Sequence, residues 1–194
     1  KYVGDPTYLE VGDHNVFREN TTVHRGTHES LPTRIGSHNL LLCYSHVAHD
    51  CQLGDHIILS NSVGLAGHIT VEDYAIVSGV AGVHQFVRIG KHSIVGGYSK
   101  VVQDVPPFMI VDGHPAVTRG LNIIGLQRRG FAEDDIKALK SAYKKLFLAG
   151  KISYDHIACA TAADILNKRK CDVVGELKVA IVPIFQFDVP GISI

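Results

Sequence analysis

The sequence predicts a mainly β protein, a parallel β-helix of hexapeptide repeats followed by a small α-helical C-terminal region. The main observation is a run of twelve aliphatic residues spaced six apart, which are Ile35, Leu41, Val47, Leu53, Leu59, Leu65, Val71, Val77, Val83, Ile89, Val95 and Val101. A helix period of about 3.6 residues and a strand period of about 2 both fail to produce this spacing. A hexapeptide period is typical of a solenoid in which three repeats close one coil.

A second observation is that the position two residues before each aliphatic one is mostly small or β-branched, from Thr33 and Asn39 to Ser93 and Ser99. One residue after the aliphatic position, glycines such as Gly36 and Gly54 suggest the backbone freedom of a sharp corner. Because one coil uses eighteen residues, residues eighteen apart are expected to lie above one another on coils about 4.8 Å apart.

The β-helix is expected over residues 1–107. The register extends backward through Val23, Phe17 and Val11, and the stretch 26–33 is turn-like in composition, so it is predicted to be a loop outside the solenoid. The pattern stops at Pro106 and Pro107.

The C-terminal region is expected over residues 108–194. Residues 131–148 have apolar side chains at helical spacing, with acidic residues early and lysines late, as the helix dipole favours. A second helix is predicted over residues 154–167.

Composition excludes some classes of protein. The 194 residues carry a formal net charge of zero, which gives no support for a nucleic-acid-binding protein. We expect no transmembrane segment and no signal peptide. The four cysteines show no spacing typical of disulfides, so a cytoplasmic location is expected.

The eighteen-residue coil period brings several candidate catalytic residues together on one edge of the predicted β-helix. His49, Gly67 and Gln85 form one column, Asp50, His68 and Phe86 the next, and Ala48, Ala66 and His84 a third. We therefore expect His49, His68 and His84 to meet. Histidine exchanges protons near neutrality, so His49 is the candidate general base, with Asp50 orienting it. Gly67 is expected to leave space for a substrate and to offer its N–H to an oxyanion.

Clustered histidines also suit zinc, and the segment Cys43-x-x-His46-x-x-His49-x-Cys51 is compatible with such a site. By contrast, His38, His56 and His92 share one repeat position with Tyr74, which suggests a surface ladder without catalytic meaning.

Several segments resemble the family of UDP-N-acetylglucosamine O-acyltransferases that begin lipid A biosynthesis. They are HVAHDC at residues 46–51, LAGH at 65–68, GVHQF at 82–86 and GLQRRGF at 125–131, with KYVGDP at 1–6 and QDVPP at 103–107. The resemblance implies a left-handed β-helix, a homotrimer with active sites between subunits, and neither a metal nor another cofactor. It also implies further N-terminal coils, so we expect this chain to be a fragment or a shortened form.

The resemblance implies transfer of a 3-hydroxyacyl chain from acyl carrier protein to the 3-hydroxyl of UDP-N-acetylglucosamine. His49 would be the base, Asp50 its support and Gly67 the oxyanion donor. The positions implied around the sugar nucleotide and the pantetheine arm are Lys1, His46, His68, His84, Gln85, Asn122 and Arg128, with Arg129 near the diphosphate. Gly97 matches the position that caps the acyl groove, where glycine indicates a longer chain. The basic docking surface expected for the carrier protein comprises Arg128, Arg129, Lys140, Lys144 and Lys145.

Three alternatives stay open at this point. A related hexapeptide acyltransferase would keep His49 and use another nucleotide sugar or acyl-CoA. A zinc-dependent hydratase of the carbonic anhydrase type also uses three histidines on a β-helix. A non-catalytic trimeric scaffold is the third.

Overall fold

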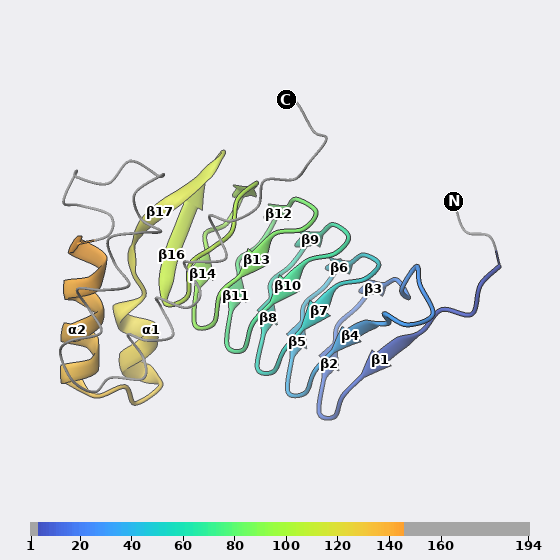
Figure 1. Cartoon of the computed structure of the whole chain (residues 1–194), viewed down its shortest axis with the longest axis horizontal. Helices are drawn as coiled ribbons and strands as arrows, with labels where there is room; N and C mark the ends of the chain where they lie inside the picture. Colours follow the sequence, from blue (N-terminus) through green and yellow to red (C-terminus); the bar gives the residue numbers. More distant parts are fainter. Residues whose placement is uncertain (1–3, 146–194) are drawn as a thin grey trace. The chain divides into compact units, whose positions relative to one another are not determined.

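The computed structural model describes residues 4–145, which fall into two compact units, one ending at Asn122 and the other beginning at Ile123. The first unit is a β-helix, in which consecutive short strands lie on three different sheets and every third strand returns to the same sheet (Figure 1). The fold class predicted from the hexapeptide period is thus confirmed, while the left-handed winding stays a prediction.

Each sheet is built from strands stacked one coil apart. The first sheet contains β1 (Leu9–Val11), β4 (Thr33–Ile35), β7 (Gln52–Leu53), β10 (Thr70–Val71) and β13 (Arg88–Ile89). The second contains β2 (Val16–Phe17), β5 (Leu40–Leu41), β8 (Ile58–Leu59), β11 (Ile76–Val77), β14 (Ile94–Val95), β16 (Met109–Gly113) and β17 (Ala116–Leu121). The third contains β3 (Thr22–Val23), β6 (His46–Val47), β9 (Gly64–Leu65), β12 (Gly82–Val83) and β15 (Lys100–Val101).

The register of the strand pairs gives the number of residues in each coil. Thr70 pairs with Arg88, eighteen residues later, as the hexapeptide period requires. In the first coil, Leu9 instead pairs with Thr33, twenty-four residues later. The six additional residues belong to the connection 24–32 between β3 and β4, in the region where the sequence analysis expected a loop.

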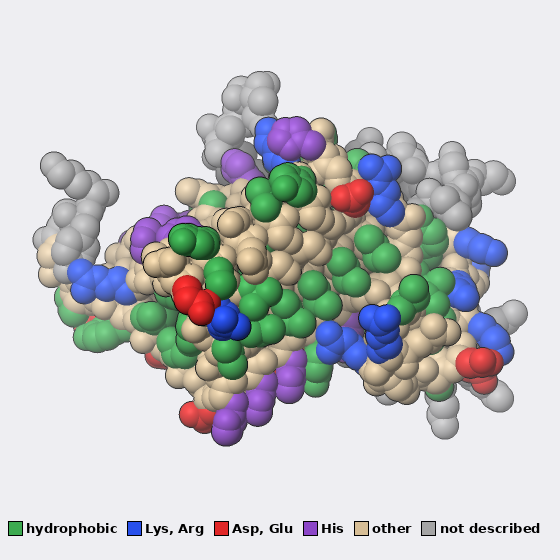
Figure 2. Space-filling view, turned by 180° about the vertical axis from the view of Figure 1, so that it is seen from behind, with side chains coloured by type: hydrophobic (Ala, Val, Ile, Leu, Met, Phe, Trp, Pro, Cys, Tyr) green, Lys and Arg blue, Asp and Glu red, His purple; other side chains and the backbone are tan. Residues whose placement is uncertain are grey.

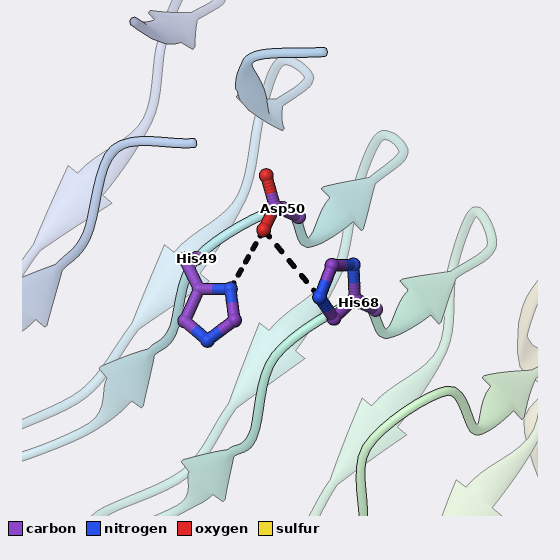
Figure 3. A group of neighbouring side chains, drawn as sticks. All are labelled: His49, Asp50 and His68. Atoms are coloured by element: carbon purple, nitrogen blue, oxygen red, sulfur yellow. Dashed lines mark hydrogen bonds and ion pairs between the residues drawn. The ribbon is translucent and has the colours of Figure 1, made fainter. Parts of the chain in front are cut away.

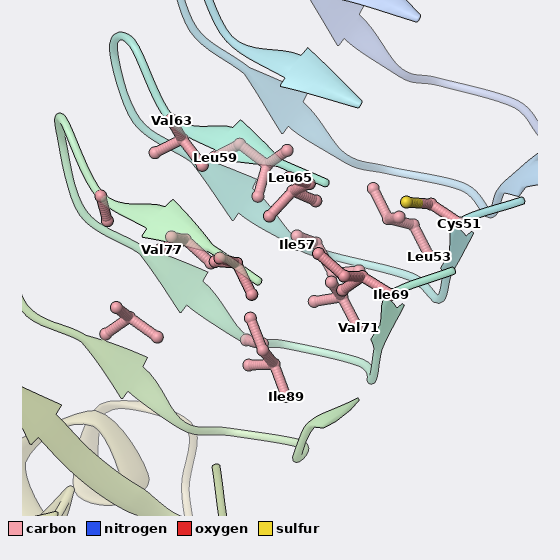
Figure 4. Close-up of a cluster of buried hydrophobic side chains, with 14 of the residues drawn as sticks. Cys51, Leu53, Ile57, Leu59, Val63, Leu65, Ile69, Val71, Val77 and Ile89 are labelled. Atoms are coloured by element: carbon pink, nitrogen blue, oxygen red, sulfur yellow. The ribbon is translucent and has the colours of Figure 1, made fainter. Parts of the chain in front are cut away.

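The core is formed by the two repeating sets of residues identified in the sequence (Figure 4). None of the twelve aliphatic residues from Ile35 to Val101 is more than 4% exposed, and each contributes about 1.5–3 kcal/mol by its burial. Val11 and Phe17 follow the same register but are 44% and 42% exposed. Their strands belong to the first described coil, which has a neighbouring coil on one side only.

The corners do not use glycine in the way the sequence suggested. At the corners of the coils, positive φ is adopted by non-glycine residues, most of them spaced six apart, including Asp50 and His68, each with φ of 61°. Gly36 and Gly54 have no positive φ; a Cβ at either would collide with the Asp55 or Asp73 carboxylate of the next coil. The prediction of conformational freedom at these glycines was wrong, because close approach between coils is what requires them.

The sheet continues beyond residue 107, where the sequence analysis placed the end of the β-helix. β16 pairs in parallel with β14, and β17 pairs antiparallel with β16. The hexapeptide period ends before this hairpin, yet Met109 and Val111 alternate with less buried residues, which is the period of an ordinary strand on a sheet edge.

The second unit contains α1 (Ile123–Arg128) and α2 (Glu133–Tyr143), and α2 lies within the predicted range 131–148. Its first turn is acidic, and Ile136 and Leu139 are buried on one face. The helix predicted over 154–167 lies outside the described residues. Neither helix between residues 4 and 145 is long and apolar enough to cross a bilayer.

Candidate active site

Three polar side chains meet at one corner of the β-helix (Figure 3). His49 and Asp50 lie in the turn between β6 and β7, and His68 lies in the equivalent turn one coil later. Nδ1 of His49 is 2.7 Å from Oδ2 of Asp50, and Nε2 of His68 is 3.5 Å from the same oxygen. The two imidazole rings are 5.1 Å apart and nearly perpendicular.

The column predicted from the eighteen-residue spacing continues with Phe86. Its ring stacks on His68 with a centroid separation of 4.7 Å and an angle of 10°. Phe86 is 70% exposed, so it covers one face of His68 while remaining open to solvent on the other side.

The Asp50 carboxylate is buried and heavily hydrogen-bonded. The residue is 2% exposed, and it accepts bonds from the Thr27 N–H, the Thr27 hydroxyl and His49. Burial by itself would raise the pKa of Asp50, but the hydrogen bonds from Thr27 and His49 and the nearby His68 together bring this pKa below its ordinary value. Asp50 is therefore ionised near neutral pH.

An ionised Asp50 fixes the proton arrangement of His49. The carboxylate can only accept, so Nδ1 of His49 carries the proton that it donates. Nε2 is then left with its lone pair. Since the His49 side chain is 34% exposed, this nitrogen can take a proton from a bound molecule.

Gly67 lies directly against the His49 ring. A Cβ at this position would be 2.5 Å from Cε1 and 2.8 Å from Nε2 of His49. The prediction that this glycine leaves space for a substrate was wrong, because the imidazole occupies that space. Within residues 4–145 the Gly67 N–H has no hydrogen-bond acceptor, so it can donate to a bound oxygen.

A metal ion is sterically possible at this cluster. One ligand atom each from His49, Asp50 and His68 lies within 4.8 Å of the others. His84 does not join them: it is exposed, and its Nδ1 faces the Gln85 carbonyl at 3.1 Å. The close cluster therefore contains two histidines and one aspartate, and the wider meeting with His84 stays a prediction.

The adjacent thiol is inert. Cys51 is fully buried, its Sγ faces the Ala66 carbonyl at 3.0 Å, and burial raises its pKa to about 11. A thiol in this state is a poor nucleophile and a poor metal ligand.

His46 belongs to the same segment but faces a different set of partners. Its Nδ1 is 2.7 Å from Oγ1 of Thr22, and its ring meets His24 edge-on at 4.6 Å. Burial, with a smaller contribution from His24, lowers the pKa of His46. The ring is thus predominantly neutral at pH 7.

The other predicted site residues that the structure describes belong to different elements of the two units. Gln85 is exposed in the turn after β12, two coils from His49. Asn122 is 4% exposed, and its side-chain amide donates to the His92 carbonyl at 2.9 Å. Arg128 and Arg129 are exposed residues of the second unit, at and after the end of α1. Lys1 lies outside the described residues.

Gly97 is on another corner, in the column that contains Asn61 and Gly79. Of the atoms in residues 4–145, a Cβ there would touch only the Gly79 carbonyl oxygen, at 3.4 Å, and φ is not positive. A side chain can therefore be accommodated at this position.

The histidine ladder is a separate feature. A stepped row of histidine side chains follows one edge of the first unit (Figure 2). His14 stacks on His38 and His38 on His56, both at 4.9 Å, and the stack continues through Tyr74 to His92. The predicted surface ladder is confirmed.

Sequence reasoning missed Thr27 and Thr33. Both contact Asp50, the latter by accepting the Asp50 N–H at 2.7 Å. The six additional residues of the first coil take Thr27 out of the columns of residues spaced eighteen apart. The spacing of the repeat therefore does not predict the contact between Thr27 and Asp50. Thr33 occupies an ordinary core position of the repeat.

Known proteins resemble this chain in sequence and in structure. A model of the second domain of UDP-N-acetylglucosamine O-acyltransferases matches residues 104–172. The acyl-[acyl-carrier-protein]–UDP-N-acetylglucosamine O-acyltransferase of Akkermansia muciniphila is 61% identical over 153 residues, which are 79% of this chain and 59% of that relative. The chain thus spans somewhat more than half of this curated relative.

Two solved structures are similar to a larger share of this chain. LpxA from Acinetobacter baumannii superposes with a TM-score of 0.83 at 39% identity, covering 93% of this chain and 69% of the other. UDP-N-acetylglucosamine O-acyltransferase (LpxA) from Moraxella catarrhalis gives 0.82 at 42% identity with the same coverage. The repeat, the His49–Asp50 corner and these likenesses together show that the chain belongs to the UDP-N-acetylglucosamine O-acyltransferase family.

Proposed function

We propose that this chain transfers a 3-hydroxyacyl group from acyl carrier protein to the 3-hydroxyl of UDP-N-acetylglucosamine, the first step of lipid A biosynthesis. The observation that carries the proposal is the bond from His49 Nδ1 to the buried Asp50 carboxylate, in a member of this family. It leaves one exposed imidazole nitrogen ready to accept a proton.

In the first step, Nε2 of His49 removes the proton from the sugar 3-hydroxyl while the oxygen attacks the thioester carbonyl carbon. The imidazolium that forms is stabilised by Asp50, and the Gly67 N–H donates to the carbonyl oxygen as it becomes negative. The carbon–sulfur bond then breaks, and His49 returns the proton to the departing pantetheine sulfur. The acyl group passes directly to the sugar, and the inert state of Cys51 supports a route without a covalent enzyme intermediate.

Substrate binding is assigned to the family positions named above. His68 lies beside the base, and His84 and Gln85 are exposed on the same corner, so they are suited to contact the acceptor or the pantetheine arm. His46 offers a neutral ring three residues before the base. Lys1, Asn122, Arg128 and Arg129 complete the proposed set, with the Arg129 guanidinium on the diphosphate.

The site is proposed to lie between subunits of a homotrimer. Gly97, the proposed cap of the acyl groove, is on a different corner of the β-helix from His49, so a neighbouring copy would bring the two together. Tyr44, Val80 and Tyr98 are 65%, 49% and 77% exposed and share the column next to Gly97 with the exposed Ser62. Such a surface suits burial between subunits.

The carrier protein is proposed to dock on exposed basic side chains of the second unit, which are Arg128, Arg129, Lys140, Lys144 and Lys145. Binding of acidic acyl carrier protein should weaken as salt increases, because exposed charges are screened. Affinity that does not change with salt would contradict this docking surface. Cys43 and Cys51 are free thiols, which fits the proposed cytoplasmic location.

A transfer assay with 3-hydroxyacyl carrier protein and UDP-N-acetylglucosamine tests the proposal. The parent should form 3-O-acyl product, and His49→Ala should lose about 10²–10⁴-fold in kcat, the usual contribution of a general base. His56→Ala, in the stacked ladder, is the matched control and should keep parental activity. An active His49→Ala variant would remove the proposed base from the mechanism.

A further inference from the structure

The connection 24–32 changes the hydrogen bonding of the repeat beside Asp50. At the equivalent corner of later coils, the backbone N–H donates to the carbonyl one coil earlier, as from His68 to His49 at 3.0 Å and from Phe86 to Gly67 at 3.3 Å. The Asp50 N–H donates instead to Oγ1 of Thr33. The longer first coil has therefore replaced the regular backbone contact with side-chain and loop contacts.

Thr27, in this connection, holds both oxygens of the Asp50 carboxylate. Its backbone N–H donates to Oδ1 at 2.8 Å and its hydroxyl donates to Oδ2 at 2.8 Å. The neighbouring Gly26 is buried, and a Cβ there would lie 3.2 Å from Oδ1 of Asp50 and would collide with the Leu31 carbonyl oxygen. Glycine thus permits the close approach that these two bonds require.

The loop itself is anchored to the body of the first unit. The Gly26 N–H donates to the Tyr8 carbonyl at 2.9 Å, and the Thr33 N–H donates to the same oxygen at 3.2 Å. Within the loop, His28 and Leu31 form a bridge. Thr27 is therefore a fixed donor and does not depend on a ligand for its position.

The two bonds determine which way the carboxylate faces. With Oδ1 held by the Thr27 N–H, Oδ2 is directed at Nδ1 of His49 and receives the Thr27 hydroxyl as well. Among residues 4–145, the titratable side chains that pair with the carboxylate are His49, from its own turn, and His68, from the next coil.

We propose that Thr27 is a positioning residue that locks the Asp50 carboxylate against His49 and so keeps the catalytic imidazole in its base-competent tautomer and orientation. This inference rests on the proposed function of His49. The Thr27 hydroxyl and N–H are also two of the contacts that lower the pKa of Asp50, which is consistent with stabilisation of the charged carboxylate.

The experiment compares Thr27→Val, which removes the hydroxyl at nearly constant shape, with Thr27→Ser, which retains it. Thr27 is an exposed residue, so the valine opens no core cavity. Thr21→Val is the matched control: it removes a hydroxyl from the same coil, where the partners are the Leu42 carbonyl and Ser45. Steady-state kinetics, thermal unfolding and the pH titration of the Asp50 carboxylate by ¹³C NMR are measured for each variant.

Thr27→Val should lower kcat about tenfold with little change in KM, as expected for loss of one hydrogen bond to a charged group. Its Asp50 titration midpoint should rise, because a bond that favours the ionised form is gone. Thr27→Ser should restore both values to within about twofold of the parent, and Thr21→Val should leave both unchanged.

A parental kcat and Asp50 midpoint in Thr27→Val would overturn the inference, as would a Thr27→Ser variant as impaired as the valine. If the parent itself transfers no acyl group, the proposed function fails, whereas the Asp50 titration still decides whether Thr27 holds the carboxylate.

Discussion

The His49 imidazole packs so closely on Gly67 that no side chain larger than hydrogen fits at residue 67 without moving the ring. The two residues are eighteen positions apart and occupy the same corner on adjacent coils. Gly67 therefore supports the face of the proposed base, in addition to offering its N–H beside the reaction centre.

Replacing Gly67 by alanine should displace His49 and reduce kcat at least about tenfold, with a stability loss of about 1–3 kcal/mol from overpacking. Transfer kinetics and thermal unfolding check this. Gly64→Ala is the matched control, because a Cβ at Gly64 in β9 meets no atom of the described part of the chain within 4 Å. Parental kinetics in Gly67→Ala would show that the ring is not held where the structure places it.

Acid should destabilise the protein partly through Asp50. Its pKa in the folded protein is below the unfolded value of about 3.9, so the stabilisation is fully present above that unfolded value. It is lost as the pH falls through the lower folded pKa. Asp50→Asn should therefore show a smaller loss of unfolding free energy than the parent between about pH 5 and pH 2.

Denaturant unfolding across this pH range measures the difference between the two proteins. An asparagine side chain is not protonated in this pH range. Its NH₂ group would donate a hydrogen bond towards Nδ1 of His49, where the carboxylate accepts one. This favours the imidazole tautomer that cannot act as the base through Nε2. The same variant should lose about 10²–10⁴-fold in transfer rate at neutral pH. A pH dependence of stability equal to that of the parent would contradict the assigned direction of the Asp50 pKa.

Gly97→Met should shift donor preference towards shorter hydroxyacyl chains, starting from a longer chain such as a fourteen-carbon one. The backbone accepts a side chain at this position, so the protein should remain folded. Each methylene that the methionine excludes from the groove is worth about 0.8 kcal/mol. Competition between donors of different length measures the shift, and unchanged selectivity would place the cap elsewhere.

Removal of metal ions should leave transfer activity intact, because the proposed mechanism uses His49 as a general base and has no step that needs a metal ion. Activity after dialysis against chelator, together with metal analysis of the parent and of His68→Ala, makes the comparison. Stoichiometric zinc that disappears in His68→Ala, with activity lost in chelator, would instead favour the zinc hydratase alternative.

Much of this protein could be predicted from the sequence because a solenoid is governed by a local repeat. The six-residue spacing directs the repeated aliphatic side chain of each hexapeptide inward, and all twelve of these residues from Ile35 to Val101 are buried. The eighteen-residue coil then places His68 beside Asp50 without knowledge of any other contact. Both predictions depend only on the register of the hexapeptide repeat, which can be read directly from the sequence.

Tertiary structure decided whatever departs from that register. Thr27 reaches Asp50 through a coil that is six residues longer than the rest, and no periodicity specifies where such a loop folds back. The β16–β17 hairpin joins the sheet after the repeat has ended, because strand pairing requires an available edge and not a hexapeptide. His84 shares the predicted corner but turns to the Gln85 carbonyl, since register fixes where a residue sits and local contacts fix where its side chain points.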